Sequence, residues 1–128
     1  MKKPSAILCI LLILCCFPSC HLKEKFEQYK AVNESLISAF QHEKINTSYN
    51  WSTTEGENNV SVTFYDYPID SVSYPELEEM ANQVQQSVQT SYPGFKELDY
   101  IEVRFTKEKD LETADSFVTF KNDLKPER

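Results

Sequence analysis

Residues 73–94, SYPELEEMANQVQQSVQTSYPG, carry the clearest local signal in the chain. Ser73 and Glu76 have the spacing of a capping box, and Pro75 suits the first turn of a helix. Apolar residues then recur at steps of three and four, opposite a polar face rich in glutamine: Leu77, Met80, Ala81, Val84 and Val88. The last three residues quoted end the pattern. The stretch predicts an amphipathic helix whose apolar stripe another element must cover.

On each side of this helix the sequence predicts a pair of strands. Residues 47–53 and 60–67 alternate apolar with polar side chains, and residues 55–59 between them contain one of only two glycines. They are therefore expected to form a hairpin. Residues 99–107 alternate in the same way, and residues 116–121 form the last predicted strand after a polar loop.

A first helix is predicted over residues 23–43, because apolar residues again recur at helical spacing: Leu22, Phe26, Tyr29, Val32, Leu36, Ile37 and Phe40. The element order is then α-β-β-α-β-β. We expect an α+β fold with a four-stranded, mainly antiparallel sheet and two helices packed on one face. Residues 62–64 and 118–120 both read Val-Thr-Phe, which leaves an internal duplication open.

Length and composition favour one acidic domain. Residues 23–123 are expected to form it, and residues 124–128 are expected to fray. The formal net charge is −7, with 20 acidic against 13 basic residues and no basic cluster. Nucleic acid and anionic lipid headgroups would repel such a chain, so no nucleic-acid partner is expected.

The N-terminus has the pattern of an export signal. Lys2 and Lys3 precede about a dozen consecutive apolar residues, 6–17. The run is too short for a membrane-spanning helix, which needs about 20 apolar residues. No small-x-small site for an ordinary signal peptidase follows it.

Ser19-Cys20 resembles the end of a bacterial lipobox, in which a small residue precedes the lipidated cysteine. Phe17 and Pro18 stand where that pattern more often has Leu and then Ala or Ser. The resemblance implies that residues 1–19 are removed, that the Cys20 thiol is diacylated, and that residues 20–22 form a very short tether. All four cysteines lie at or before Cys20, so cleavage leaves one unpaired thiol, and lipid attachment would account for it.

The expected location is therefore the bacterial cell envelope, with the chain anchored by lipid. In a Gram-negative cell the outer membrane is favoured over the inner one. A secreted protein is the alternative, and four Asn-x-Ser/Thr sequons keep a eukaryotic origin open: those at Asn33, Asn46, Asn50 and Asn59.

The sequence offers little for catalysis, and we expect no catalytic residue, no metal site and no cofactor. None of the phosphate-loop, HExxH, GxSxG or Cys/His metal patterns occurs. His21 adjoins the expected anchor, and His42 is interpreted as a contact with the carbonyl end of the first helix. Carboxylates gather between Asp66 and Glu79, most simply as a connection and a helix N-terminus.

The sheet face away from the helices is the candidate binding surface. Strand alternation places a set of aromatic and charged residues there: Tyr65, Tyr67, Tyr100, Glu102, Arg104, Phe117, Thr119 and Lys121. Tyrosine with arginine is typical of protein-binding surfaces. Aromatic residues on a half-solvated antiparallel face give the same composition without a partner. The register of Trp51 stays open.

Three functions are compatible with this sequence. The first is a membrane-anchored, non-catalytic module that binds or assembles with an envelope protein through the open face. The second is an envelope enzyme, or an enzyme accessory, that uses the carboxylates between Asp66 and Glu79. The third is a secreted inhibitor-like domain, which rests on fold analogy alone.

Overall fold

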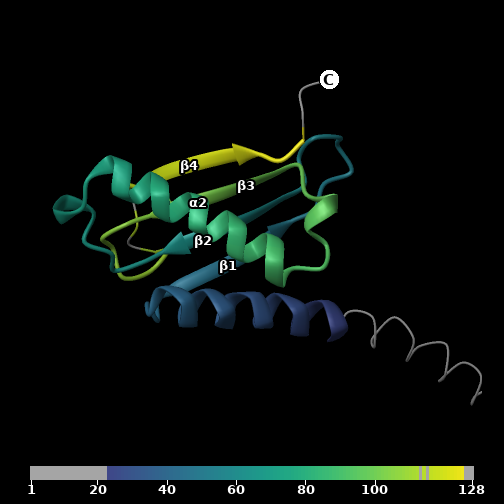
Figure 1. Cartoon of the computed structure of the whole chain (residues 1–128), viewed down its shortest axis with the longest axis horizontal. Coiled ribbons are helices and arrows are strands. Elements are labelled where there is room, and N and C mark those ends of the chain that lie inside the picture. The colour runs from purple at the N-terminus through teal and green to yellow at the C-terminus, as the bar shows by residue number, and fades with distance from the viewer. Residues whose placement is uncertain (1–22, 113, 115, 126–128) are drawn as a thin grey trace, which may run out of the picture.

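The computed structural model of the chain describes residues 23–112, 114 and 116–125. These residues form two α-helices and one four-stranded sheet (Figure 1). In chain order they are the N-terminal helix (residues 23–40), β1 (Ile45–Asn50), β2 (Asn59–Phe64), α2 (Tyr74–Ser91), β3 (Tyr100–Phe105) and β4 (Val118–Asp123). Two short 3₁₀ helices, Ile69–Ser71 and Phe95–Glu97, flank α2. The predicted α+β class is confirmed. The predicted signal peptide, Cys20 and the tether lie outside the described residues.

The sheet is mostly antiparallel, as predicted, but its central pair is parallel. The strand order is β1-β2-β3-β4, with β1–β2 and β3–β4 antiparallel. β2 and β3 run in the same direction, and the chain between them includes α2. A parallel pair needs such a crossover, because a tight turn can join only antiparallel neighbours.

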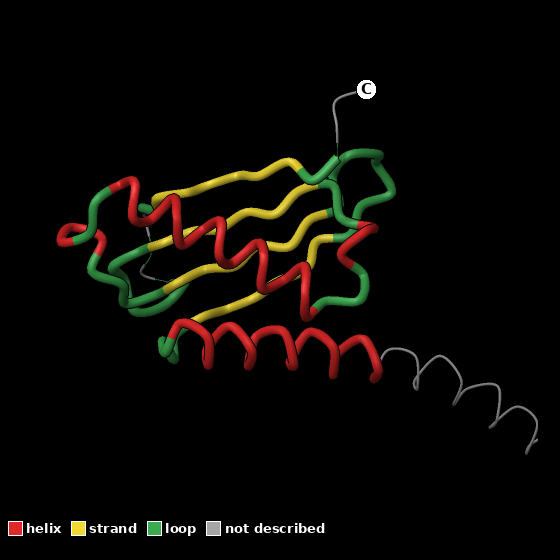
Figure 2. Tube along the Cα trace, in the orientation of Figure 1, coloured by secondary structure: helices red, strands yellow, loops and turns green. Residues whose placement is uncertain are grey.

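Both α-helices contribute to one buried cluster on a single face of the sheet. Its members from the helices are Val32, Leu36, Leu77, Ala81, Val84 and Val88, and those from the strands are Ile45, Val60, Val62, Phe64, Ile101, Val103, Phe105 and Phe120. The Phe64 ring meets Phe40 edge-on at 5.6 Å and stacks on Phe105 at 4.9 Å. Figure 2 shows α2 lying across the strands while the N-terminal helix runs beside β1. Neither α-helix covers the other face.

The topology argues against an internal duplication. β1 and β3, the first strands of the two halves, run in opposite directions, since β2 is antiparallel to β1 and parallel to β3. A rotation in the plane of the sheet can align β1 with β3. It then places β2 on the side of β3 that is opposite to β4. Because both helices contact the same face, no rotation superposes the halves. The shared Val-Thr-Phe triplets therefore need no explanation beyond the alternation of a half-buried strand.

The element boundaries follow local chemistry. α2 begins where the capping box predicts, and the Ser73 hydroxyl accepts a 3.4 Å hydrogen bond from the Glu76 backbone N–H. β1 starts at Ile45, two residues before the predicted start, because Ile45 is buried and pairs with Phe64. It ends at Asn50, so Trp51 follows the strand. Across the described residues, no helix combines the length and the apolar character needed to cross a bilayer.

The first two residues of the predicted tail are held by the domain. The Leu124 backbone N–H donates to the Asp99 carbonyl at 2.9 Å, and its side chain packs against the core. The Lys125 ammonium lies 2.9 Å from the Asp99 carboxylate. Leu124 and Lys125, the first two residues of the tail predicted to fray, thus contact the domain, and residues 126–128 lie outside the described part.

Candidate functional site

The strand register brings most of the predicted binding residues onto the sheet face that the α-helices leave open. Glu102 pairs with Ser61 on one side and with Lys121 on the other. Arg104 pairs in the same way with Thr63 and Thr119. Since paired residues point to the same side of a sheet, these side chains share one surface. We call it the open face: Tyr100, Glu102, Arg104, Thr119 and Lys121, over a floor of Asn59, Ser61 and Thr63.

The floor of the open face is buried although neither α-helix covers it. Asn59, Ser61 and Thr63 belong to the central strand β2, and each exposes less than a tenth of its surface. Their side chains are short, and the longer side chains of β3 stand beside them in register. The open face therefore has a small polar centre with long side chains along one side.

A hydrogen-bonded row crosses the open face at one end and orders Lys121. The Asn50 amide donates to the Asn59 amide oxygen at 3.0 Å, and the Asn59 amide donates to the Tyr100 hydroxyl at 2.9 Å. The Lys121 ammonium lies 4.3 Å from the centre of the Tyr100 ring. The hydrogen bonds link β1, β2 and β3, and the Tyr100 ring holds a lysine of β4 over its face, where cation and ring attract.

Arg104 is ordered in a similar way at the other end. Its guanidinium lies 4.8 Å from the Phe117 ring centre, and its Nε lies 4.0 Å from a Glu102 carboxylate oxygen. That Nε is buried and makes no hydrogen bond within the described residues. An unpaired buried donor costs free energy, which an acceptor brought by a ligand could recover.

Two predicted members do not contribute to this surface. The prediction that Tyr67 lies on the open face is wrong, because Tyr67 lies on the helix side of the sheet. Its hydroxyl donates to the Met80 sulfur at 2.9 Å, and its ring packs 5.4 Å from Phe105. Tyr65 is 8% exposed and offers little area. The physical reason is that β2 ends at Phe64 and the chain turns at Asp66, which has a positive φ of 51°. Strand alternation cannot be extended past such a turn.

Two of the carboxylates between Asp66 and Glu79 form ion pairs on the surface. Asp66 pairs with Lys44 and Asp70 with Lys107, both at 3.6 Å and both exposed. No group of three or more acidic, histidine or cysteine side chains that could hold a metal occurs in the part of the chain that the structure describes.

His42 differs from its interpretation as a cap of its own helix. Its Nε2 donates instead to the Tyr65 carbonyl at 2.6 Å. Its ring packs against Phe64 and Tyr67 at 5.8 and 5.5 Å. The contacts of His42 thus fasten the end of the N-terminal helix to the end of β2.

The structure adds an aromatic cluster that the sequence patterns left unassembled. Tyr29 stacks on Tyr49 with ring centres 3.6 Å apart, and both rings approach Tyr92. The Trp51 indole N–H donates to the Tyr29 hydroxyl at 3.2 Å. A shallow pocket of about 250 Å³ lies here, lined by Lys25, Phe26, Tyr29, Tyr49 and Trp51. The sequence signal that could have indicated this cluster was the three-residue step from Phe26 to Tyr29, which lies on one helix face, together with the two-residue step from Tyr49 to Trp51.

Burial favours the neutral form of Tyr49 and Tyr92 by raising the pKa of each phenol. Loss of water raises the pKa of Tyr49 well above the ordinary value of 10.0, and the neighbouring phenols of Tyr92 and Tyr29 add to the effect. The pKa of Tyr92 is raised in the same way, by burial first and then by Tyr29. The Tyr49 hydroxyl is buried and has no hydrogen-bond partner within the described residues.

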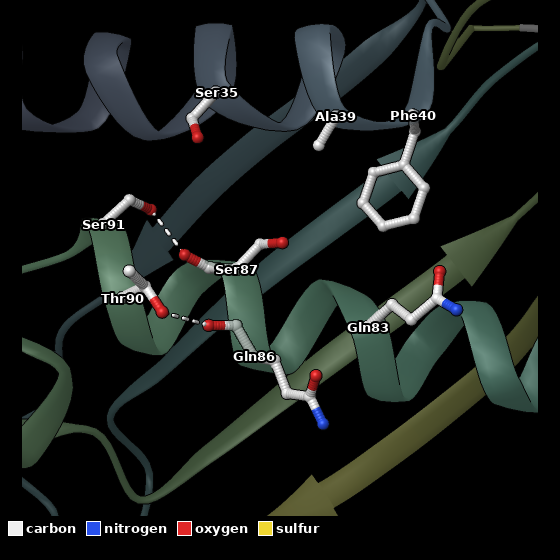
Figure 3. A pocket seen from close by; sticks show the side chains of 8 residues that line it. All are labelled: Ser35, Ala39, Phe40, Gln83, Gln86, Ser87, Thr90 and Ser91. Carbon is white, nitrogen blue, oxygen red and sulfur yellow. Dashed lines mark hydrogen bonds between the residues drawn. The ribbon is translucent and has the colours of Figure 1, made fainter.

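A second depression lies between the two α-helices. Figure 3 shows its lining, which is neutral, and its volume is about 430 Å³: Ser35, Ala39, Phe40, Gln83, Gln86, Ser87, Thr90 and Ser91. The Thr90 and Ser91 hydroxyls donate to backbone carbonyls one turn earlier, at 3.0 and 2.7 Å. None of these eight lining residues has an acidic or basic side chain, so the lining places no acid or base beside its hydroxyls.

Comparison with protein-family models, with curated proteins and with solved structures finds no match for this chain.

Proposed function

We propose that this chain is a lipid-anchored, non-catalytic envelope protein that binds a protein partner through the open face. The observation that carries the proposal is the ordering of the two cations there. Lys121 lies over the Tyr100 ring and Arg104 over the Phe117 ring, at 4.3 and 4.8 Å. Long basic side chains that are already ordered lose less conformational entropy when a partner binds.

The chemistry of the open face suits a protein better than a small ligand. The face combines the Tyr100 ring, an arginine and a carboxylate, and the Phe117 ring lies beside the arginine. Arginine and tyrosine are enriched at protein interfaces, because they bury much area and still offer directed hydrogen bonds. The packing of both helices on the opposite face leaves this surface free to bind.

The anchor in this proposal is a diacylated Cys20. Two acyl chains hold a protein on a membrane with little dissociation, since each buried CH₂ contributes about 0.8 kcal/mol. The test is the mass of the mature N-terminus from the membrane fraction. An acylated Cys20 is expected, and the Cys20→Ala variant is expected to lose both the modification and membrane retention. An unmodified terminus at another residue would overturn the anchor.

Site-specific photo-cross-linking in the producing cell tests the binding face. A photoreactive amino acid at Thr119, exposed on the open face, is expected to yield one discrete cross-linked protein. The same group at Glu79, exposed on α2, is the matched control and is expected to yield none. Arg104→Ala with Lys121→Ala should remove the Thr119 product while the chain stays folded. Equal products from both positions would reject the open face as the binding site. A Thr119 product that survives the double substitution would reject the two ordered cations as the groups that bind the partner.

A further inference from the structure

We propose that Phe26, Trp51 and Lys25 form a second membrane contact, inserted in the interfacial layer of the bilayer beside the lipid anchor. This inference rests on the lipid anchor of the proposed function. It adds that the aromatic end of the domain lies against the membrane.

Two large aromatic side chains at this end are more exposed than folding requires. Phe26 exposes 69% of its surface and Trp51 exposes 44%. Phe26 packs edge-on against Tyr29 at 6.5 Å, and Trp51 donates to the same tyrosine. Tyr29 in turn stacks on Tyr49, which is rooted in the sheet. The exposed rings are therefore held outward by a rigid aromatic base.

The composition of the patch favours a lipid surface over water or another protein. Tryptophan and tyrosine concentrate at the level of the lipid headgroups, where a ring with one polar edge fits best. Lys25 lies beside them, with its ammonium 5.9 Å from the Trp51 ring centre. A lysine here can bury its aliphatic stem and keep its charge among the headgroups.

The position in the chain brings the patch to the membrane. The described helix begins at residue 23, three residues after Cys20. With at most about 3.5 Å per residue to residue 23 and about 1.5 Å per helical residue beyond, the Cα of Phe26 lies within about 15 Å of the Cα of Cys20. The interfacial layer itself is about 5–8 Å thick on each side of the hydrocarbon core. An anchored Cys20 therefore keeps the start of the helix close to the surface.

Trp51 reaches the same place through the fold. β1 begins at Ile45, just after the N-terminal helix, and pairs along its length with β2 (Figure 1). The strand returns beside the helix, as the stack of Tyr29 on Tyr49 and the hydrogen bond from Thr47 to Asn33 at 2.8 Å require. Trp51, one residue past the strand, thereby meets the first turns of the helix.

Charge attraction does not drive this contact. Along the exposed start of the helix the basic and acidic residues are equal in number: Lys23, Lys25 and Lys30 against Glu24, Glu27 and Glu34. The whole chain is acidic, with a net charge of −7. Burial of aromatic area must supply the attraction, so salt and anionic lipid should not strengthen it.

The chain carries its own reporter, because Trp51 is its only tryptophan. The lipidated mature protein is reconstituted in phosphatidylcholine vesicles with either ordinary or brominated acyl chains. Bromine quenches tryptophan fluorescence on contact. We expect Trp51 emission to fall in brominated vesicles, with a blue shift relative to the soluble Cys20→Ala protein. The decrease in Trp51 emission caused by brominated lipid should be unchanged by added salt.

Phe26→Ser is expected to reduce the quenching and reverse the blue shift. Its matched control is Leu111→Ser, which removes an apolar side chain of similar exposure, 64%, from the loop between β3 and β4. That loop follows Phe105, which is in register with Phe64 and so lies at the opposite end of the sheet from Trp51. Leu111→Ser should leave quenching unchanged. Near-UV circular dichroism should show intact aromatic packing in both variants.

The possible failures are distinct. Equal Trp51 emission in ordinary and brominated vesicles, from protein that remains on them, would overturn the second contact and leave the anchor standing. A blue shift that grows with protein concentration without lipid would instead assign the patch to a second copy of the chain. If Cys20 proves unmodified, the proposed anchor fails, and quenching is then read on vesicles added directly to the soluble protein. No quenching in that assay would overturn the contact too.

Discussion

The two faces of β2 are equally buried but are buried by different means. Phe64 is fully buried and Thr63, its neighbour, exposes 1% of its surface. The apolar face is covered by two helices, and its side chains fill a close-packed cluster. On the polar face, the longer side chains of β3 stand in register beside the short side chains of β2. Burial alone therefore does not identify the residues that hold the fold, and the element that provides the cover has to be named.

Among the substitutions on the two faces, replacing Phe64 should lower the free energy of unfolding most. Phe64→Ala is expected to lower the free energy of unfolding by about 3–5 kcal/mol, since it opens a cavity among close-packed rings. Chemical denaturation monitored by circular dichroism measures it. The matched control is Thr63→Ala, expected to cost about 1 kcal/mol. Equal losses from the two variants would mean that the faces contribute alike.

The next largest effect is expected from alkaline pH, which should lower the stability of the packing on the helix-covered face. The folded chain retains the phenol protons of Tyr49 and Tyr92 at pH values where the unfolded chain releases them, because both pKa values are raised. The stability is therefore fully present below the ordinary pKa of 10.0 and falls as pH rises above it. Denaturation midpoints measured across that pH should decrease.

Tyr49→Phe is the control for the alkaline effect. Phenylalanine keeps the ring stack on Tyr29 and removes the buried, unpaired hydroxyl. It should make the alkaline loss smaller and should cost no stability at neutral pH. An unchanged alkaline loss would assign the effect to other groups.

The sequence predicted the parts of this fold that depend on local spacing. The capping box of Ser73 and Glu76 located α2, and alternation located the ends of all four strands to within three residues. The sequence did not predict the parallel β2–β3 pair or the strand order. These depend on where α2 returns the chain, which is a property of the assembled core rather than of any segment.

The sequence also predicted only part of the candidate site. Tyr100, Glu102 and Arg104 share a face because they lie within one regular strand. Tyr67 does not, since the positive φ of Asp66 breaks the alternation before it. The aromatic cluster joins residues of the N-terminal helix to Tyr49 and Trp51, and only the packed structure brings them together.

On the open face, the hydrogen-bonded row is expected to matter more for stability than the charges above it. Asn59→Ala removes both the donor to Tyr100 and the acceptor for Asn50. We expect a loss of about 1–3 kcal/mol, because the groups left behind are partly desolvated. Asn46→Ala is the matched control, exposed on β1 on the same face, and should have little effect. A negligible loss at Asn59 would mean that the row is not a structural element.

The smallest effect on stability is expected at Lys121, and it separates holding the fold from binding. Lys121→Gln keeps most of the side-chain length and removes the charge over the Tyr100 ring. The cost in unfolding free energy should be about 0.5–1 kcal/mol, the usual range for an exposed cation–π contact. Cross-linking from Thr119, by contrast, should fall sharply if the open face binds a partner. A variant that loses stability without losing the cross-link would make Lys121 part of the scaffold, and the open face would then resemble the apolar face in role as well as in burial.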